Sequence, residues 1–81
     1  MRLLLFGQVR DGAAHLHGAE IETDARCVRE LIDWFRSQDG EIAISIDRPG
    51  LRFAVDQCFA DLETTITRES EVAVMSPLSG G

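Results

Sequence analysis

The spacing of hydrophobic residues changes along this chain, and each spacing predicts a different element. Residues 2–9 contain a short apolar run, Leu3-Leu4-Leu5-Phe6, which is typical of a strand buried on at least one face. From Val28 onwards, apolar side chains recur at i, i+3, i+4 and i+7, which is the stripe of an amphipathic helix. We therefore expect a strand at the start of the chain and a helix that begins near Val28 and ends at Gly40.

Extended structure is predicted for most of the remaining chain. Hydrophobic and polar positions alternate in residues 51–56, which indicates a half-buried strand, and residues 57–60 can return beside it. Residues 71–75 are apolar enough for a strand at the centre of a sheet. Residues 14–22 also favour a strand. Residues 41–47 have isoleucine at every second position, which favours a strand or an extended connector.

The order of these elements predicts an α+β fold. One helix would lie across one face of a mixed sheet, with the first and last strands as neighbours at its centre, which is the β-grasp arrangement. Pro77 cannot donate a hydrogen bond to a neighbouring strand, so pairing should stop near it. We therefore predict one domain over residues 1–76 and a flexible C-terminal tail over residues 77–81.

Charge and composition narrow the class of partner. The chain has 81 residues and a net charge of −6, from fourteen acidic residues and eight basic residues that are all arginine. Nucleic acid is not expected as a partner because phosphate binding needs clustered positive charge, whereas a basic protein partner is favoured. No apolar run approaches the roughly 20 residues of a membrane helix. We expect no membrane association and a cytoplasmic location.

Few side chains suggest chemistry of their own. Cys27 and Cys58 have no second cysteine pair, so zinc-ribbon spacing is absent. His15 and His17 would share one face of a strand, but two imidazoles do not make a metal site, and no bound metal is expected. No nucleophile, base and orienting group can be recognised together, so we expect no active site within this chain. The roles of these cysteines and histidines stay open.

The most specific motif is the diglycine in Ser79-Gly80-Gly81, with which the sequence ends. Glycine has no Cβ, so Gly80 and Gly81 can pass through a narrow channel that excludes larger residues. A chance Gly-Gly at one fixed pair of positions has a frequency of about 0.5%, because average glycine usage is about 7%. The alternative is a frayed terminus without a function.

Five blocks of the sequence occur in an order that is known from one family. The blocks are Phe6-Gly7-Gln8-Val9-Arg10, residues 28–31, Phe53-Ala54-Val55-Asp56-Gln57, Glu71-Val72-Ala73-Val74 and Ser76-Pro77-Leu78-Ser79-Gly80-Gly81. Over nearly the whole length they resemble the small subunit of molybdopterin synthase, a ubiquitin-like sulfur carrier. Asp56 stands where this family usually has Asn, and Met75-Ser76 replace a Phe-Pro pair. The effect of these departures on partner binding stays open.

The resemblance implies a sulfur carrier whose reactive carboxylate belongs to Gly81. An E1-like adenylating enzyme would use ATP to form a glycyl adenylate there. A sulfur donor such as a cysteine desulfurase system would convert the adenylate to a thiocarboxylate, or 1-thioglycine. The large subunit of molybdopterin synthase would pass this sulfur to cyclic pyranopterin monophosphate within a heterotetramer. No cofactor would be stably bound, and the partners would supply the catalytic groups.

The same resemblance implies which residues meet a partner. Pro77, Leu78 and Ser79 would enter the partner with the diglycine, whereas Phe6 and Met75 border the docking face or lie in the core. The second hypothesis is a sulfur carrier for thiazole synthesis or another thiolation pathway, since those relatives share the fold and the diglycine. Thiazole carriers tend to be shorter after the helix, so the length favours the molybdopterin branch. A third hypothesis is a non-catalytic interaction domain with an inert tail.

Overall fold

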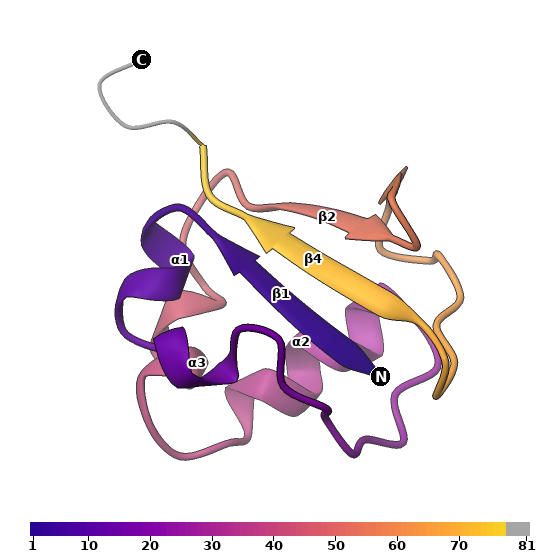
Figure 1. The fold of residues 1–81 in the computed structure, drawn as a ribbon, viewed down its shortest axis with the longest axis horizontal. Coiled ribbons are helices and arrows are strands. Elements are labelled where there is room, and N and C mark those ends of the chain that lie inside the picture. Colours follow the sequence, from indigo (N-terminus) through magenta and orange to yellow (C-terminus); the bar gives the residue numbers. More distant parts are fainter. Residues whose placement is uncertain (78–81) are drawn as a thin grey trace.

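The computed structural model describes residues 1–77, which form a four-stranded mixed sheet with helices on one face (Figure 1). β1 (Arg2–Phe6) pairs in parallel with β4 (Glu71–Met75). β2 (Arg52–Val55) pairs antiparallel with β4 and with β3 (Cys58–Ala60), so the strand order is β1-β4-β2-β3. This arrangement confirms the predicted α+β fold of the ubiquitin-like β-grasp type.

The predicted main helix is confirmed as α2 (Val28–Arg36), which lies behind the sheet in Figure 1. It ends at Arg36, earlier than the predicted end at Gly40. Gly40 has a φ of +98° and instead stands at the N-terminal cap of the next helix. A left-handed φ favours glycine, so Gly40 marks the turn between two helices.

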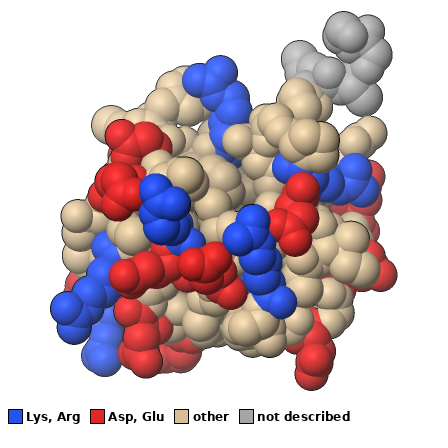
Figure 2. Space-filling model, turned by 180° about the vertical axis from the view of Figure 1, so that it is seen from behind, with Lys and Arg blue, Asp and Glu red and all other residues tan. Residues whose placement is uncertain are grey.

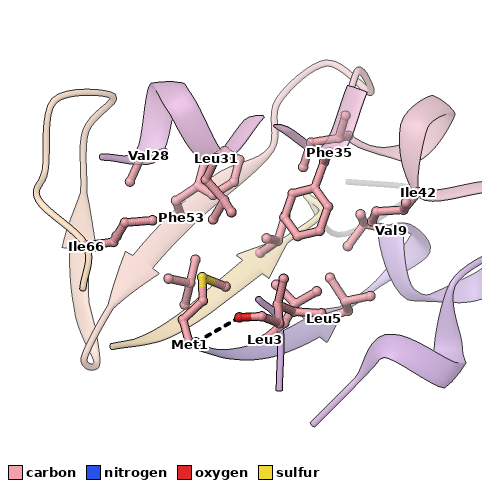
Figure 3. Close-up of a cluster of buried hydrophobic side chains, with 14 of the residues drawn as sticks. Met1, Leu3, Leu5, Val9, Val28, Leu31, Phe35, Ile42, Phe53 and Ile66 are labelled. Carbon is pink, nitrogen blue, oxygen red and sulfur yellow. Dashed lines mark hydrogen bonds between the residues drawn. The ribbon is translucent and has the colours of Figure 1, made fainter. Parts of the chain in front are cut away.

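The hydrophobic core lies between the sheet and α2 (Figure 3). Alternate residues of β1 and β4 point toward the helix, because successive side chains of a strand face opposite sides of a sheet. The largest fully buried side chains are Leu3, Leu5, Val9, Val28, Leu31, Phe35, Val72 and Val74. Full burial of one such side chain is worth about 1.5–3 kcal/mol, so this cluster is the main source of stability.

The predicted strand over residues 14–22 is wrong. Residues Ala14–Leu16 form a 3-10 helix, η1, and Gly18 follows with a φ of +80°. The segment after Gly18 runs beside β1: the Leu3 amide donates to the Ala19 carbonyl at 3.0 Å. A single bridge, between Arg2 and Glu20, is its only strand-like pairing within residues 1–77. β1 is therefore an edge strand of the four-stranded sheet, and only β4 of the predicted central pair is central.

The first strand is shorter than the predicted 2–9. β1 ends at Phe6 because Gly7 has a φ of +81° and turns the chain into α1 (Gln8–Asp11). Val9 is fully buried, so its side chain belongs to the core although its backbone is helical. Val9, which the hydrophobic pattern assigns to the strand, therefore anchors a helical turn.

The predicted strand or extended connector over residues 41–47 is also wrong, because the structure has α3 (Glu41–Ser45) there. Ile42 and Ile46 are 5% and 4% exposed, whereas Ile44 between them is 69% exposed. Residues four apart share one face of a helix. Ile42 and Ile46 therefore share the buried face of α3, and Ile44 points to solvent. The alternation of isoleucines, which favours a strand, does not decide the conformation here.

The hairpin of β2 and β3 agrees with the predicted strands over residues 51–56 and 57–60, within one residue at most ends. Asp56 and Gln57 have φ values of 49° and 70°, as the two central residues of a type I′ turn require. The Asp56 carboxylate accepts a hydrogen bond from the Glu71 amide at 2.9 Å. The acid at this position is therefore compatible with the turn. No helix in residues 1–77 is long and apolar enough to cross a membrane.

Candidate functional site

The candidate site begins at Ser76, the residue that follows the last strand. Its amide donates to the Phe6 carbonyl at 3.0 Å, and its hydroxyl accepts from the Val9 amide at 2.7 Å. A Cβ on Gly7 would lie 3.0 Å from the Cβ of Ser76, which is tighter than most real Cβ contacts. These contacts fix the start of the tail against the end of β1 and the first turn of α1.

Pro77 leaves the domain beside the loop that precedes β2. A Cβ on Gly50 would lie 3.3 Å from the Pro77 ring, so this loop packs closely on the proline. Arg48, in the same loop, donates to the Gln8 side-chain oxygen at 3.2 Å. The loop and α1 therefore meet around the base of the tail. Pro77 itself is exposed, and the predicted site residues Leu78, Ser79, Gly80 and Gly81 lie outside the described residues.

The sheet face opposite α2 is the second part of the candidate site. No helix or strand of residues 1–77 crosses this face, which is turned toward the viewer in Figure 1. We call it the open face. The register places two rows of side chains across it: Leu4, Ala73, Ala54 and Phe59 in one row, and Phe6, Met75 and Arg52 in the other, nearer the tail.

Large apolar side chains on the open face are unusually accessible. Phe6 is 43% exposed and Phe59 is 72% exposed. A shallow hollow of about 290 Å³ beside β3 is lined by Arg52, Phe59 and Leu62, among other residues, and extends this apolar surface. Contiguous exposed apolar surface next to polar residues is typical of protein interaction sites.

The structure places the predicted residues Phe6 and Met75 together on the open face, paired in register, and neither belongs to the buried core. Their predicted contact with a partner stays a prediction. His17 supports Phe6, because their rings meet edge to face with centroids 5.5 Å apart. The Nδ1 of His17 accepts a hydrogen bond from the Leu5 amide at 3.0 Å, so this imidazole also contacts the edge of β1.

Arg52 and Phe59 are residues of the open face that the sequence pattern did not single out. The Arg52 guanidinium lies over the Phe59 ring, 4.8 Å from its centroid. The alternation in residues 51–56 could have indicated Arg52, because it must face away from the buried Phe53. No comparable signal marks Phe59, since its exposure depends on the edge position of β3.

The cysteines and histidines form no site with the tail. Cys58 pairs with Val55 at the end of the sheet opposite Met75, and Cys27 is half-buried at the N-terminal cap of α2. In the described part of the chain, no three His, Cys, Asp or Glu side chains are arranged to hold a metal ion. A larger hollow of about 610 Å³ lies between Met1 and Arg68, at the end of the sheet away from the tail.

The helix side of the molecule differs in its electrostatics. Basic and acidic side chains alternate over it in Figure 2. Arg29 forms an ion pair with Glu63, and Arg36 forms ion pairs with Asp33 and Asp47. The hydrogen bond and the charge of Glu63 raise the pKa of Arg29, and those of Asp47 raise the pKa of Arg36. All these groups are exposed, so the pairs contribute little to stability.

The geometry therefore consists of a clamped tail base beside an open apolar face. The chain matches the ThiS family over residues 3–81. No curated protein matches it. This family implies a sulfur carrier that works with an E1-like activating enzyme and a synthase, which confirms the predicted carrier role at that level. The chain belongs to the ThiS family of ubiquitin-like sulfur carriers.

Proposed function

We propose that this chain is the sulfur carrier of molybdenum cofactor biosynthesis and acts as the small subunit of molybdopterin synthase. The blocks described above support this pathway because they resemble that subunit in order over nearly the whole chain. The main structural support for this pathway is the segment after α2. It contains the additional helix α3 and keeps the length that favours the molybdopterin branch over thiazole carriers.

The reaction needs a carboxylate that partners activate. An oxygen of the Gly81 carboxylate attacks the α-phosphorus of ATP in the activating enzyme, pyrophosphate leaves, and a glycyl adenylate forms. Sulfide attacks the acyl carbon and releases AMP, which leaves the thiocarboxylate. If the donor is a persulfide, the first product is an acyl disulfide, and a thiol must cleave its S–S bond. The thiocarboxylate sulfur then attacks a carbon of cyclic pyranopterin monophosphate in the large subunit and displaces an oxygen there. Water cleaves the acyl–sulfur bond, which leaves the sulfur on the pterin and restores the Gly81 carboxylate.

This chain contributes position to the reaction. The two hydrogen bonds of Ser76 hold the tail base, and the open face gives the partner an apolar surface to cover. Four residues, 78–81, can reach at most about 13–14 Å when extended, at 3.3–3.6 Å per residue. This reach is enough for Gly81 to enter a pocket while the domain stays outside. The absence of side chains at Gly80 and Gly81 serves passage through the channel.

Intact-protein mass spectrometry tests the carrier chemistry. After incubation with ATP, the activating enzyme and a sulfur donor, we expect a gain of about 16 Da at Gly81, which is the replacement of one oxygen by one sulfur. Deletion of Gly81 is the control and should abolish the gain without altering the fold. An unchanged mass of the full chain with competent enzymes would leave only an interaction domain.

The pathway is tested with the thiocarboxylated chain. We expect it to convert cyclic pyranopterin monophosphate to molybdopterin when it is combined with the large subunit of molybdopterin synthase. The same preparation should not support thiazole formation by a thiazole synthase. Turnover with the thiazole synthase alone would overturn the molybdopterin assignment and leave the family-level carrier role intact.

A further inference from the structure

Two basic side chains lie at the tail base of a protein that is acidic as a whole. The net charge is −6, yet two arginines, Arg48 and Arg52, lie beside the exit of the tail. Arg52 is opposite Met75 in the β2–β4 register, immediately before the tail. Arg48 reaches Gln8 of α1 from the loop that packs on Pro77. The two arginines therefore flank the point where the tail leaves.

Neither arginine is neutralised within residues 1–77. The arginine ion pairs there are those of Arg29 and Arg36, on the helix side. Asp47 precedes Arg48 but binds Arg36. Asp61 lines the same hollow as Arg52, but its carboxylate accepts hydrogen bonds from the Glu63 amide and the Thr64 hydroxyl. Arg48 has only an uncharged amide as its partner, and Arg52 has the ring of Phe59.

Unpaired arginines beside an apolar surface are typical of the polar rim of a protein interface. Arginine is enriched at protein interfaces, and its planar guanidinium binds carboxylates through two parallel hydrogen bonds. The Phe59 ring holds the Arg52 guanidinium in place, which lowers the entropy that a new ion pair would lose. A partner that covers the apolar rows of the open face would bring its own surface against both guanidinium groups.

We propose that Arg48 and Arg52 form a cationic rim around the tail base that recognises carboxylates beside the tail channel of the activating enzyme. The inference rests on the carrier function proposed above, and it names the partner chemistry: an apolar centre bordered by Asp or Glu at the channel mouth. The rim selects the partner and sets the rate of encounter, while the tail carries the chemistry.

The test is the kinetics of ATP–pyrophosphate exchange, catalysed by the activating enzyme with the full-length chain as substrate. We expect Arg48→Gln and Arg52→Gln each to raise the KM for the chain by about fivefold with kcat unchanged, because a rim charge acts mainly on association. The double variant should also show a weaker dependence of KM on salt. Arg52→Lys should recover most of the KM, since it keeps the charge.

Arg68→Gln is the matched control, because it removes the same charge from an exposed arginine at the opposite end of the sheet. It should behave like the unaltered chain. Equal KM values for Arg48→Gln, Arg52→Gln and Arg68→Gln would contradict the proposed rim. This holds if all three match the unaltered chain, and also if all three are raised equally, since net charge alone would then explain the effect. A loss of kcat at constant KM would also overturn it. No exchange with the unaltered chain would instead refute the proposed activation at Gly81, and the rim with it.

Discussion

The two faces of the sheet are built from the same strands but have different surroundings. On the helix side, Leu3 and Leu5 of β1 are fully buried beneath α2. On the open face, Leu4 is partly covered by its neighbours alone, and Phe6 is 43% exposed. Both sets are apolar, so the difference lies in what covers them. One face holds the fold together, and the other keeps apolar surface available for a partner.

The charges follow the same division. On the helix side, Arg29 and Arg36 are neutralised by acids on α2 and on nearby loops. On the open face, Arg52 stacks on Phe59 and forms no ion pair within residues 1–77. A surface that is complete in the free protein has its charges paired locally, whereas a binding surface keeps them for the partner.

Truncation of neighbouring leucines should show the largest difference between the faces. Leu5→Ala should lower the free energy of unfolding by about 2–5 kcal/mol, because it opens a cavity in the core. Leu4→Ala removes the same atoms from the open face and should cost less than about 1 kcal/mol. Urea denaturation followed by circular dichroism measures both. Equal losses would mean that the two faces contribute alike to stability.

The open face should matter for binding more than for folding. Phe59→Ser should weaken binding to the activating enzyme by about 2 kcal/mol, the size of an aromatic hot spot, and leave unfolding within about 0.5 kcal/mol of the parent. Isothermal titration calorimetry measures the affinity. Ile44→Ser is the control, because Ile44 is 69% exposed on α3 and lies off the open face. Equal losses of affinity for both variants would contradict a docking role for this face.

Substitution of Gly7, at the tail base, should have a smaller effect on the free energy of unfolding. Gly7 and Gly18 have nearly the same φ, +81° and +80°, but only a Cβ on Gly7 would meet Ser76. Gly18→Ala should cost about 1–2 kcal/mol from the left-handed backbone alone. Gly7→Ala should cost roughly 1 kcal/mol more, since the tail base must also shift. Thermal unfolding of the two variants gives this difference, and its absence would show that the close approach is not stabilising.

The smallest effect is expected for the ion pairs of the helix side. Arg36→Gln should leave the denaturation midpoint almost unchanged, because its partners are exposed and screened. Asp47 raises the pKa of Arg36, so the contribution of the pair is complete below the ordinary arginine pKa and is lost only at strongly alkaline pH. Unfolding curves at pH 6 and pH 9 should therefore show the same small difference between variant and parent.

The main helix and the strands of the hairpin could be predicted from sequence, whereas the short helices α1 and α3 could not. The stripe from Val28 to Phe35 and the alternation in residues 51–56 repeat often enough to specify a helix and a strand. α1 and α3 are only four and five residues long, and tertiary contacts decide their conformation. Val9 of α1 depends on Ser76, which is 67 residues away along the chain.

The candidate site divides in the same way. The diglycine motif is recognisable from local sequence, whereas Phe6 and Met75 are named from the family resemblance; the structure places these two side by side on the open face. The importance of Arg52 and Phe59 depends on which face of the sheet stays uncovered and on the edge position of β3. An alternating pattern predicts a strand with two different faces, but it does not predict which face a helix will cover.

The tail continues from β4, an interior strand with a neighbour on each side. β4 is hydrogen-bonded to β1 along one edge and to β2 along the other. Both rows of hydrogen bonds extend along the axis of β4, which is the direction in which the chain reaches the tail. An enzyme that draws the tail into its channel therefore pulls along these ladders in shear. The load is shared by many hydrogen bonds at once, and the bonds cannot open one by one as they would in a peeled edge strand. A pull on the tail therefore meets more resistance from the fold than it would if the tail continued from an edge strand.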